Sequence, residues 1–250
     1  MSDAYWHAFF RLHADLPREG PGEADDVAWA AGIAGLRPDA AVCDAACGPG
    51  ADLPAWRAAV PGGSITAFDL HPPFVDAAAA RMAGDPRIRV LRGRLLRDPN
   101  DTLPDPRDLG RFDLIWCAGA VYLLGIEACL AAWRDALAPG GVIAFSDAVW
   151  LTDAPDPDVR RNWAEYPGMT DAAGVAARIT AAGYETLATR PVSDAAWEAY
   201  YTPIDARIAA LRPGADDALL TVLDEAAREA ALWRAHRGQF GYLLSVVRPV

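Results

Sequence analysis

Positive charge is scarce in this chain of 250 residues, in which 23 Lys and Arg face 34 Asp and Glu for a net charge of −11. Binding of a polyanion needs concentrated cations, so the composition excludes DNA or RNA as the main partner. The one local concentration is a group of arginines within 87–97, and an arginine-rich exposed strand edge explains it. A nucleic-acid substrate is therefore not predicted.

Long apolar runs are also missing. No stretch approaches the length needed to span a bilayer as a helix. The first ten residues contain aromatic side chains and Asp3, but no basic region followed by an apolar run. Neither a membrane segment nor a signal peptide is predicted.

Cysteine is sparse and shows no metal-binding pattern. None of the cysteines forms a Cys-x-x-Cys pair, and no histidine lies at metal-ligand spacing. We therefore expect no metal site. The thiols are predicted to be small core residues of a reduced, cytoplasmic protein, and they are Cys43, Cys47, Cys117 and Cys129.

What the chain does contain is a regular alternation of strand and helix patterns. Apolar, β-branched runs predict strands at 40–47, 64–70, 87–93, 112–119, 141–149, 185–192 and 240–248. Helical periodicity lies between them, as in the stripe through Ile126, Leu130, Trp133 and Leu137, and that helix is expected to stop at Pro139-Gly140-Gly141. Such alternation predicts a mostly parallel sheet with helices on both faces.

The fold class predicted is therefore α/β, a Rossmann-like, doubly wound, seven-stranded sheet that is mostly parallel with an antiparallel last strand. One domain over 1–250 accounts for the length. Within it we expect an N-terminal helical cap at 1–38, a cofactor-binding core at 39–150 and a helical insertion at 193–238, placed to act as a lid. Ligands of such sheets bind at the carboxyl ends of the strands.

A glycine loop follows the first predicted strand, in the segment Asp44-Ala-Ala-Cys-Gly-Pro-Gly50. Its glycines let backbone approach a ligand closely. A dinucleotide fingerprint fails at its third glycine, where Leu53 stands, and a phosphate loop with Gly-Lys-Ser or Gly-Lys-Thr is absent. Asp52 in the first helical turn would repel a pyrophosphate. Nicotinamide binding is thus disfavoured.

An acid also ends the second predicted strand. Asp69 lies about twenty residues after the loop, and a carboxylate at this strand tip can accept hydrogen bonds from both ribose hydroxyls. A helix-capping role before Pro72 is the plain alternative. The spacing from the glycine loop favours the ribose.

These residues resemble the class I S-adenosylmethionine-dependent methyltransferases. That family carries an acid and three alternating glycines on its first strand; this chain has Asp44, then Ala46 in place of the first glycine, then Gly48 and Gly50. The family's second-strand acid matches Asp69. Its fourth-strand pattern and its Leu-x-Pro-Gly-Gly segment match 112–119 and 137–141. Segments 18–23, 69–74, 118–125 and 163–167 further resemble a bacterial small-molecule branch of the family.

The resemblance implies S-adenosylmethionine as cofactor and in-line transfer of its methyl group to a small-molecule acceptor. An acid that often meets the adenine in this family is replaced here by Arg94, so adenine is expected to be held by backbone at 94–95 and by apolar packing. The implied cofactor-binding residues are Asp44, Ala46, Cys47, Gly48, Gly50, Asp69, Leu70, Arg94, Leu95, Cys117 and Gly119.

Candidates for the acceptor pocket near strand ends are Tyr122, Asp147 and Trp150, each of which a packing role explains as well. Tyr166 is a further candidate as part of a helical cover, although a core or surface role is favoured for it. No catalytic side chain is identified, because the sulfonium leaving group is already activated and the protein mainly aligns the reactants and excludes water. Alternatives are a non-catalytic S-adenosylmethionine-binding protein and an NAD(P)-dependent oxidoreductase. The sequence leaves open whether the chain forms a homodimer.

Overall fold

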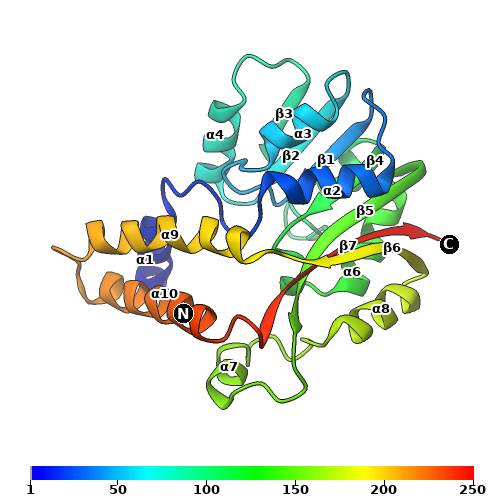
Figure 1. Ribbon diagram of the computed structural model, residues 1–250. Coiled ribbons are helices and arrows are strands. Elements are labelled where there is room, and N and C mark those ends of the chain that lie inside the picture. The colour runs from blue at the N-terminus through cyan, green and yellow to red at the C-terminus, as the bar shows by residue number, and fades with distance from the viewer. Residues whose placement is uncertain (1) are drawn as a thin grey trace.

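A seven-stranded sheet organises the computed structural model, which describes residues 2–250. The strand order is β3-β2-β1-β4-β5-β7-β6 (Figure 1). The first five of these strands in space pair in parallel, whereas β7 is antiparallel to both of its neighbours. The predicted fold class is confirmed. The strands are β1 Ala41–Ala45, β2 Ser64–Asp69, β3 Ile88–Arg92, β4 Phe112–Cys117, β5 Leu137–Trp150, β6 Tyr184–Pro191 and β7 Phe240–Pro249.

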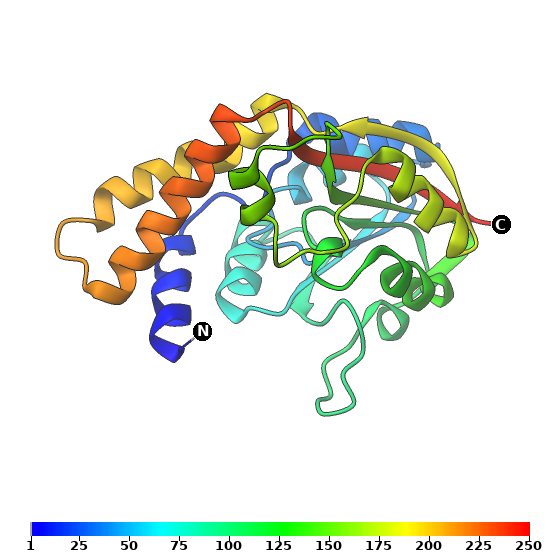
Figure 2. The same cartoon turned by 90° about the horizontal axis from the view of Figure 1, so that it is seen from below.

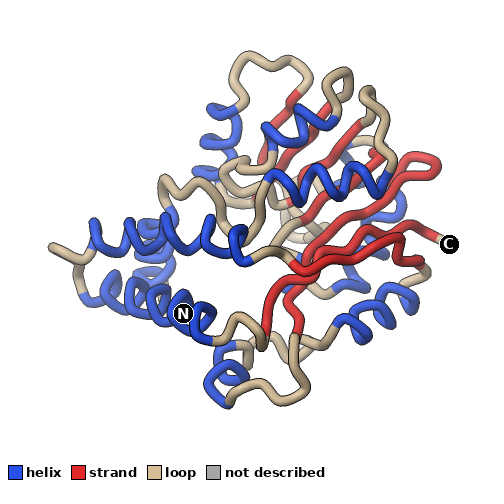
Figure 3. The backbone as a smooth tube through the Cα atoms, viewed as in Figure 1, coloured by secondary structure: helices blue, strands red, loops and turns tan. Residues whose placement is uncertain are grey.

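Helices cover both faces of the sheet (Figure 3), which is why the central strands read as continuous apolar runs. One face packs against α2 Ala24–Ala34, α3 Leu53–Ala59 and α4 Pro72–Arg81. The other packs against α6 Ile126–Trp133 and α8 Ala172–Ala181, with the short α5 Pro106–Leu109 beside them.

Three further helices form a separate group beside the sheet. They are α1 Asp3–His13, α9 Asp194–Leu211 and α10 Asp217–Ala235, and they pack on one another (Figures 1 and 2). Because β7 begins at Phe240 opposite Trp150, the last residue of β5, the insertion enters and leaves the sheet at the carboxyl ends of the parallel strands. A short helix, α7 Pro157–Asn162, follows β5.

The N-terminal segment expected as a cap at 1–38 divides in two. Its α1 packs against α9 and α10, whereas α2 lies on the sheet face with α3. Residue 1 of that expected range lies outside the described residues.

The helix before β5 ends earlier than expected. It stops at Trp133, a 3-10 turn occupies Arg134–Ala136, and β5 already begins at Leu137. The expected stop at Pro139-Gly140-Gly141 is therefore wrong, since Leu137 pairs with Phe112 across a register shift. Gly141 instead lets β5 approach β4 closely, because a Cβ there would lie 2.6 Å from the carbonyl oxygen of Phe112.

Candidate cofactor and acceptor cavities

The loop after β1 is built by residues with left-handed backbone. Ala46, Gly48 and Gly50 have φ of 59°, 53° and 77°. A Cβ on Gly50 would lie 2.8 Å from Leu53 and 2.9 Å from Ala78, so this glycine lets the loop pack between α3 and α4. Gly48 instead lines a cavity, so its backbone is open to a ligand.

Asp69 ends β2 beside that loop. Its Oδ2 accepts a hydrogen bond from the Gly48 amide at 2.9 Å, and its Oδ1 accepts one from the His71 amide at 2.9 Å. These two bonds fix the carboxylate at the edge of the cavity, and each oxygen keeps a further acceptor site. Burial raises the pKa of Asp69, although the two amide bonds oppose the shift.

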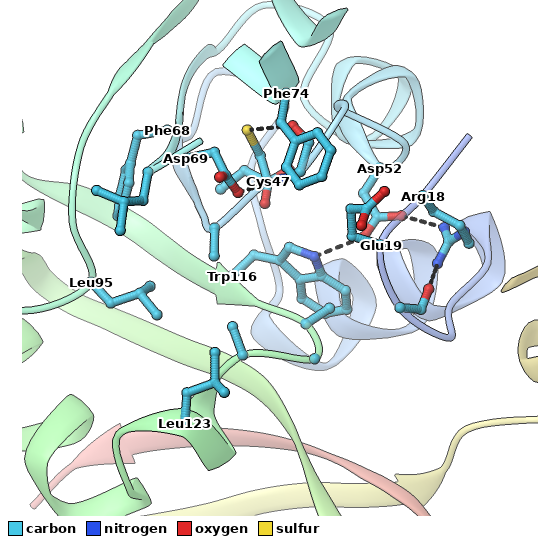
Figure 4. A pocket seen from close by; sticks show the side chains of 18 of the residues that line it. Arg18, Glu19, Cys47, Asp52, Phe68, Asp69, Phe74, Leu95, Trp116 and Leu123 are labelled. Atoms are coloured by element: carbon cyan, nitrogen blue, oxygen red, sulfur yellow. Dashed lines mark hydrogen bonds and ion pairs between the residues drawn. The ribbon is translucent and has the colours of Figure 1, made fainter. Parts of the chain in front are cut away.

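A cavity of about 420 Å³ lies over the carboxyl ends of β1, β2 and β4. Figure 4 shows Cys47, Asp69 and Phe74 on one side of it and Arg18, Glu19 and Asp52 on another. Most of the cofactor-binding residues predicted from sequence line this cavity, namely Asp44, Ala46, Cys47, Gly48, Asp69, Leu70, Arg94, Leu95 and Gly119. Gly50 and Cys117 lie outside its lining, and Cys117 is fully buried in β4.

Asp44 is a buried carboxyl with an orphaned atom. The residue is 3% exposed, and its Oδ2 has no hydrogen-bond partner. Burial, followed by the charges of Asp52 and Asp69, raises its pKa well above the ordinary value, while Arg18 opposes the shift. A buried polar atom without a partner is costly, so this wall of the cavity is suited to a donor group on a ligand.

An ion pair that the sequence did not predict lies on the opposite side of the cavity. Arg18 donates to Asp52 at 2.9 Å and to the carbonyl oxygen of Gly20 at 3.0 Å, and the indole of Trp116 donates to Asp52 at 3.0 Å. Arg18, Glu19 and Asp52 all line the cavity. The signal was the segment 18–23, which the family resemblance singled out without giving it a role.

Arg94, which stands where the family often has an acid, is neutralised locally. Its guanidinium contacts Asp101 and lies 3.7 Å from Asp98, and its backbone amide donates to the carbonyl of Pro104 at 2.9 Å. The neighbouring wall is apolar, with Phe68 and Leu95 lining the cavity. This wall suits a flat, apolar ring rather than an anion.

Cys47 is the cysteine that lines the cavity, and all four thiols of the chain have a raised pKa. Burial raises the pKa of Cys43, Cys47 and Cys117 well above the ordinary value, and that of Cys129 to about 12. All four are free cysteines.

A second cavity of about 510 Å³ opens between α1, α9 and α10 and the 3-10 turn Val121–Leu123. Phe9, the segment Glu19-Gly20-Pro21, Tyr122 and Leu123 line both cavities, so the two adjoin. The two spaces together therefore have room for two ligands side by side, one on the glycine loop and one under the helices.

Two of the acceptor-pocket candidates line this second cavity, Tyr122 and Tyr166. Asp147 and Trp150 do not. Asp147 is buried in β5 and accepts a hydrogen bond from the Tyr166 hydroxyl at 2.9 Å, so it orients that ring from behind. The indole of Trp150 donates to the carbonyl of Met169 at 3.2 Å, which is a packing role.

Within residues 2–250, no helix is long and apolar enough to cross a membrane. In the same part of the chain, no three His, Cys, Asp or Glu side chains gather in a way that would hold a metal ion.

Comparison with known proteins finds similarity over the core of the chain. Residues 43–143 match the family described as a methyltransferase domain. A malonyl-acyl-carrier-protein O-methyltransferase of Salmonella typhimurium is 32% identical over 125 residues, which are 50% of this chain and 44% of that protein. That of Pseudescherichia vulneris is 30% identical over 130 residues, 52% of this chain and 46% of that protein. The chain thus spans about half the length of the curated relatives it matches.

Solved structures share the fold over the whole chain. A methyltransferase from Geobacter sulfurreducens in complex with S-adenosyl-L-homocysteine has a TM-score of 0.80 at 18% identity, covering 98% of both chains. One from Thiobacillus denitrificans, with the same ligand, has a TM-score of 0.78 at 17% identity, covering 97% of this chain and 98% of that one. The match over 43–143 agrees with the resemblance noted in the sequence, and these structures confirm the predicted fold class.

Proposed function

We propose that this chain, whose residues 43–143 match a methyltransferase domain, transfers a methyl group from S-adenosylmethionine to a small-molecule acceptor. The observation that carries the proposal is the pairing of Asp69 with the Gly48 amide at the edge of a cavity. A carboxylate held beside open backbone matches a ribose with vicinal hydroxyls. The ligands named for the solved neighbours are of this chemistry.

The residues present fit each part of such a cofactor. Asp69 would accept from the ribose hydroxyls, and the apolar wall at Phe68 and Leu95 would hold the adenine. The orphaned oxygen of Asp44 would accept from the ammonium of the methionine end, since that buried carboxyl otherwise lacks a partner. Gly48 lines the same cavity, and its missing Cβ allows the Glu19 side chain to approach, since a Cβ there would lie 3.3 Å from Glu19 Cγ.

When bound, the cofactor supplies a methyl group on a sulfonium, which already has a good leaving group. The protein's tasks are alignment and exclusion of water. Tyr122 and Leu123, which line both cavities, would bound the path between sulfur and acceptor. The aromatic ring of Tyr122 can also stabilise positive charge at the methyl group.

We place the acceptor in the second cavity, whose size of about 510 Å³ suits a small molecule. The net charge of −11 disfavours a nucleic-acid substrate. The compartment proposed is the cytoplasm, because all four cysteines are free. A homodimer stays a prediction, to be read from light scattering.

Calorimetric titration with S-adenosylmethionine and S-adenosylhomocysteine tests the proposal. We expect binding by the wild type, and Asp69→Ala should weaken it at least tenfold, about 1.4 kcal/mol. Asp76→Ala is the matched control, an exposed aspartate of α4 outside both cavities, and should bind as the wild type does. Unchanged affinity in Asp69→Ala would remove the ribose contact from the proposal.

Turnover separates an enzyme from a non-catalytic binding protein. Amines, alcohols, thiols and carboxylic acids are incubated with the protein and S-adenosylmethionine, and formation of S-adenosylhomocysteine is measured. An acceptor-dependent rate supports the enzyme. Binding of the cofactor without any such rate favours the non-catalytic alternative.

A further inference from the structure

The second cavity is acidic. Its lining contains four glutamates and one histidine, and no arginine is among the lining residues that the structure describes. Lysine is absent from the sequence altogether. His13 contacts Glu19 at 2.6 Å, so its charge, when present, is matched by one carboxylate. The remaining glutamates, Glu165, Glu225 and Glu229, have no cation of their own in the cavity wall.

Two of these carboxylates are fixed by tyrosines. Glu225 and Glu229 lie one helical turn apart on α10, so they share a face. Glu225 accepts from the Tyr5 hydroxyl at 2.8 Å, and Glu229 accepts from the Tyr201 hydroxyl at 2.9 Å. Glu229 is solvent-accessible and lines the cavity. Desolvation by the surrounding protein raises its pKa, although the Tyr201 hydrogen bond opposes the shift, and a raised pKa makes the carboxylate a better proton acceptor.

Aromatic rings complete the lining. The Tyr122 ring lies 6.2 Å from that of Trp163, 5.9 Å from that of Tyr166 and 6.3 Å from that of Tyr242. The Trp197 ring lies 4.9 Å from that of Tyr242 on the same wall. Ring faces gathered around carboxylates form the environment that stabilises an organic cation.

Where the second cavity adjoins the cofactor cavity, one carboxylate oxygen lacks a hydrogen-bond partner. Oε1 of Glu19 is buried and has no hydrogen-bond partner, and Glu19 lines both cavities. Figure 4 shows its side chain at the cavity wall near Asp52. An N–H group presented at this junction would satisfy that oxygen.

We infer that the methyl acceptor is an organic amine, bound in the second cavity by the carboxylates of Glu225 and Glu229 and by the surrounding aromatic rings. This inference rests on the proposed methyl transfer and names its substrate class. The ammonium gives one N–H proton to the Glu229 carboxylate, which frees the nitrogen lone pair. That lone pair forms the N–C bond while the C–S bond breaks and its electron pair stays on sulfur. The products are the N-methylammonium, the thioether and a protonated Glu229 that returns its proton to water.

The same charges oppose an anionic acceptor. The curated relatives are named for a malonyl group on a carrier protein. A malonyl carboxylate in this cavity would face uncompensated glutamates at close range, and like charges in an enclosed site repel strongly. The acceptor preference of this chain is therefore inferred to differ from that of those relatives.

Matched ligands of one skeleton test the inference. Benzylamine, benzyl alcohol and benzoate are titrated into the full-length protein by calorimetry, both alone and with S-adenosylhomocysteine, and a malonyl thioester is the fourth probe. We expect benzylamine to bind at least tenfold more tightly than the alcohol or the acid. Glu229→Gln should lower benzylamine affinity and its methylation at least tenfold, whereas S-adenosylhomocysteine affinity should stay unchanged.

The control is Asp224→Asn, an exposed residue of the same helix that pairs with Arg212 at 2.8 Å, and it should behave as the wild type. Glu225→Gln is the second variant, with a loss in the same direction expected. Benzoate or the malonyl thioester binding as tightly as benzylamine, or no benzylamine binding at all, overturns the inference. Failure of S-adenosylmethionine to bind instead overturns the proposed function, and benzylamine binding to the protein alone is read independently of it.

Discussion

Every second residue from Ala46 to Gly50 in the loop after β1 adopts left-handed backbone, but a missing side chain does not have the same importance at each position. Gly50 is wedged against Leu53 and Ala78, so both its φ of 77° and its missing Cβ matter. Ala46 shows that φ near 60° alone is tolerated in this loop, where the related family carries glycine. The sequence-based expectation that one methyl group would fit at position 46 is consistent with this geometry.

Gly50→Ala should destabilise the protein by about 2–4 kcal/mol, because backbone strain adds to overpacking against α4. Gly35→Ala is the matched control, since its φ is 60° but a Cβ would meet no atom within 4 Å. That variant should lose only about 1–2 kcal/mol. Urea unfolding of both measures the difference, and equal losses would show that packing at Gly50 is unimportant.

At the scale of elements, a buried ion pair joins the N-terminal segment to the start of α3. Arg18 and Asp52 are 2.9 Å apart, and their side chains are 12% and 13% exposed. Asp52 also accepts from Trp116 of β4, so three parts of the chain meet at this carboxylate. Removal of the cation leaves a nearly buried carboxylate with the Trp116 hydrogen bond but without the cation of its ion pair.

Arg18→Met should therefore destabilise the fold by about 2–4 kcal/mol, and adding Asp52→Asn should restore part of that loss. The double-mutant cycle by urea unfolding measures the coupling. Additive losses would mean that the pair contributes nothing beyond its separate side chains.

The positions of the strands and of the helices that cover the sheet could be predicted from the sequence, because hydrophobic periodicity depends on residues close together in the chain. The apolar runs at β1 and β4, and the stripe through Val175 and Ile179 of α8, are read from neighbours in the chain. The acidic cavity could not be read in this way. Tyr5 of α1 and Glu229 of α10 line one cavity because α1 packs on α10, more than two hundred residues away in the chain, and Glu19 joins them from the loop after α1.

Over the whole molecule, desolvation by the surrounding protein raises the pKa of several carboxyl groups. Burial raises the pKa of Glu19, Asp44, Asp69 and Glu229, and raises that of Asp147 to about 6. Between its unfolded and folded pKa, such a group binds more protons in the folded state, so stability falls as pH rises. Hydrogen bonds from Arg178 and Arg234 lower the pKa of Glu127 and Glu198, and their stabilisation is lost only at lower pH. The molecule should be most stable on the acidic side of neutrality.

Asp147→Asn isolates one part of this dependence. Its pKa rises from 3.8 to about 6 on folding, so the wild type should lose about 2 kcal/mol relative to the variant between pH 4 and pH 7. The asparagine can still accept the bond from Tyr166. Urea unfolding across this range is the measurement, with exposed Asp158→Asn as the control for removing one charge. Parallel pH curves for wild type and Asp147→Asn would contradict the assignment.

Three of the thiols are buried, and the fourth, Cys47, is partly exposed but has a raised pKa, so covalent reagents find few thiolates to attack. Maleimides need a thiolate, and amine-directed esters find no lysine side chain anywhere in the chain. One cysteine placed at exposed Pro213, on the turn between α9 and α10, would then carry a fluorophore with almost no background labelling. The fluorescence of that label would report movement of the turn as ligands enter the two cavities. The native cysteines would not have to be replaced first.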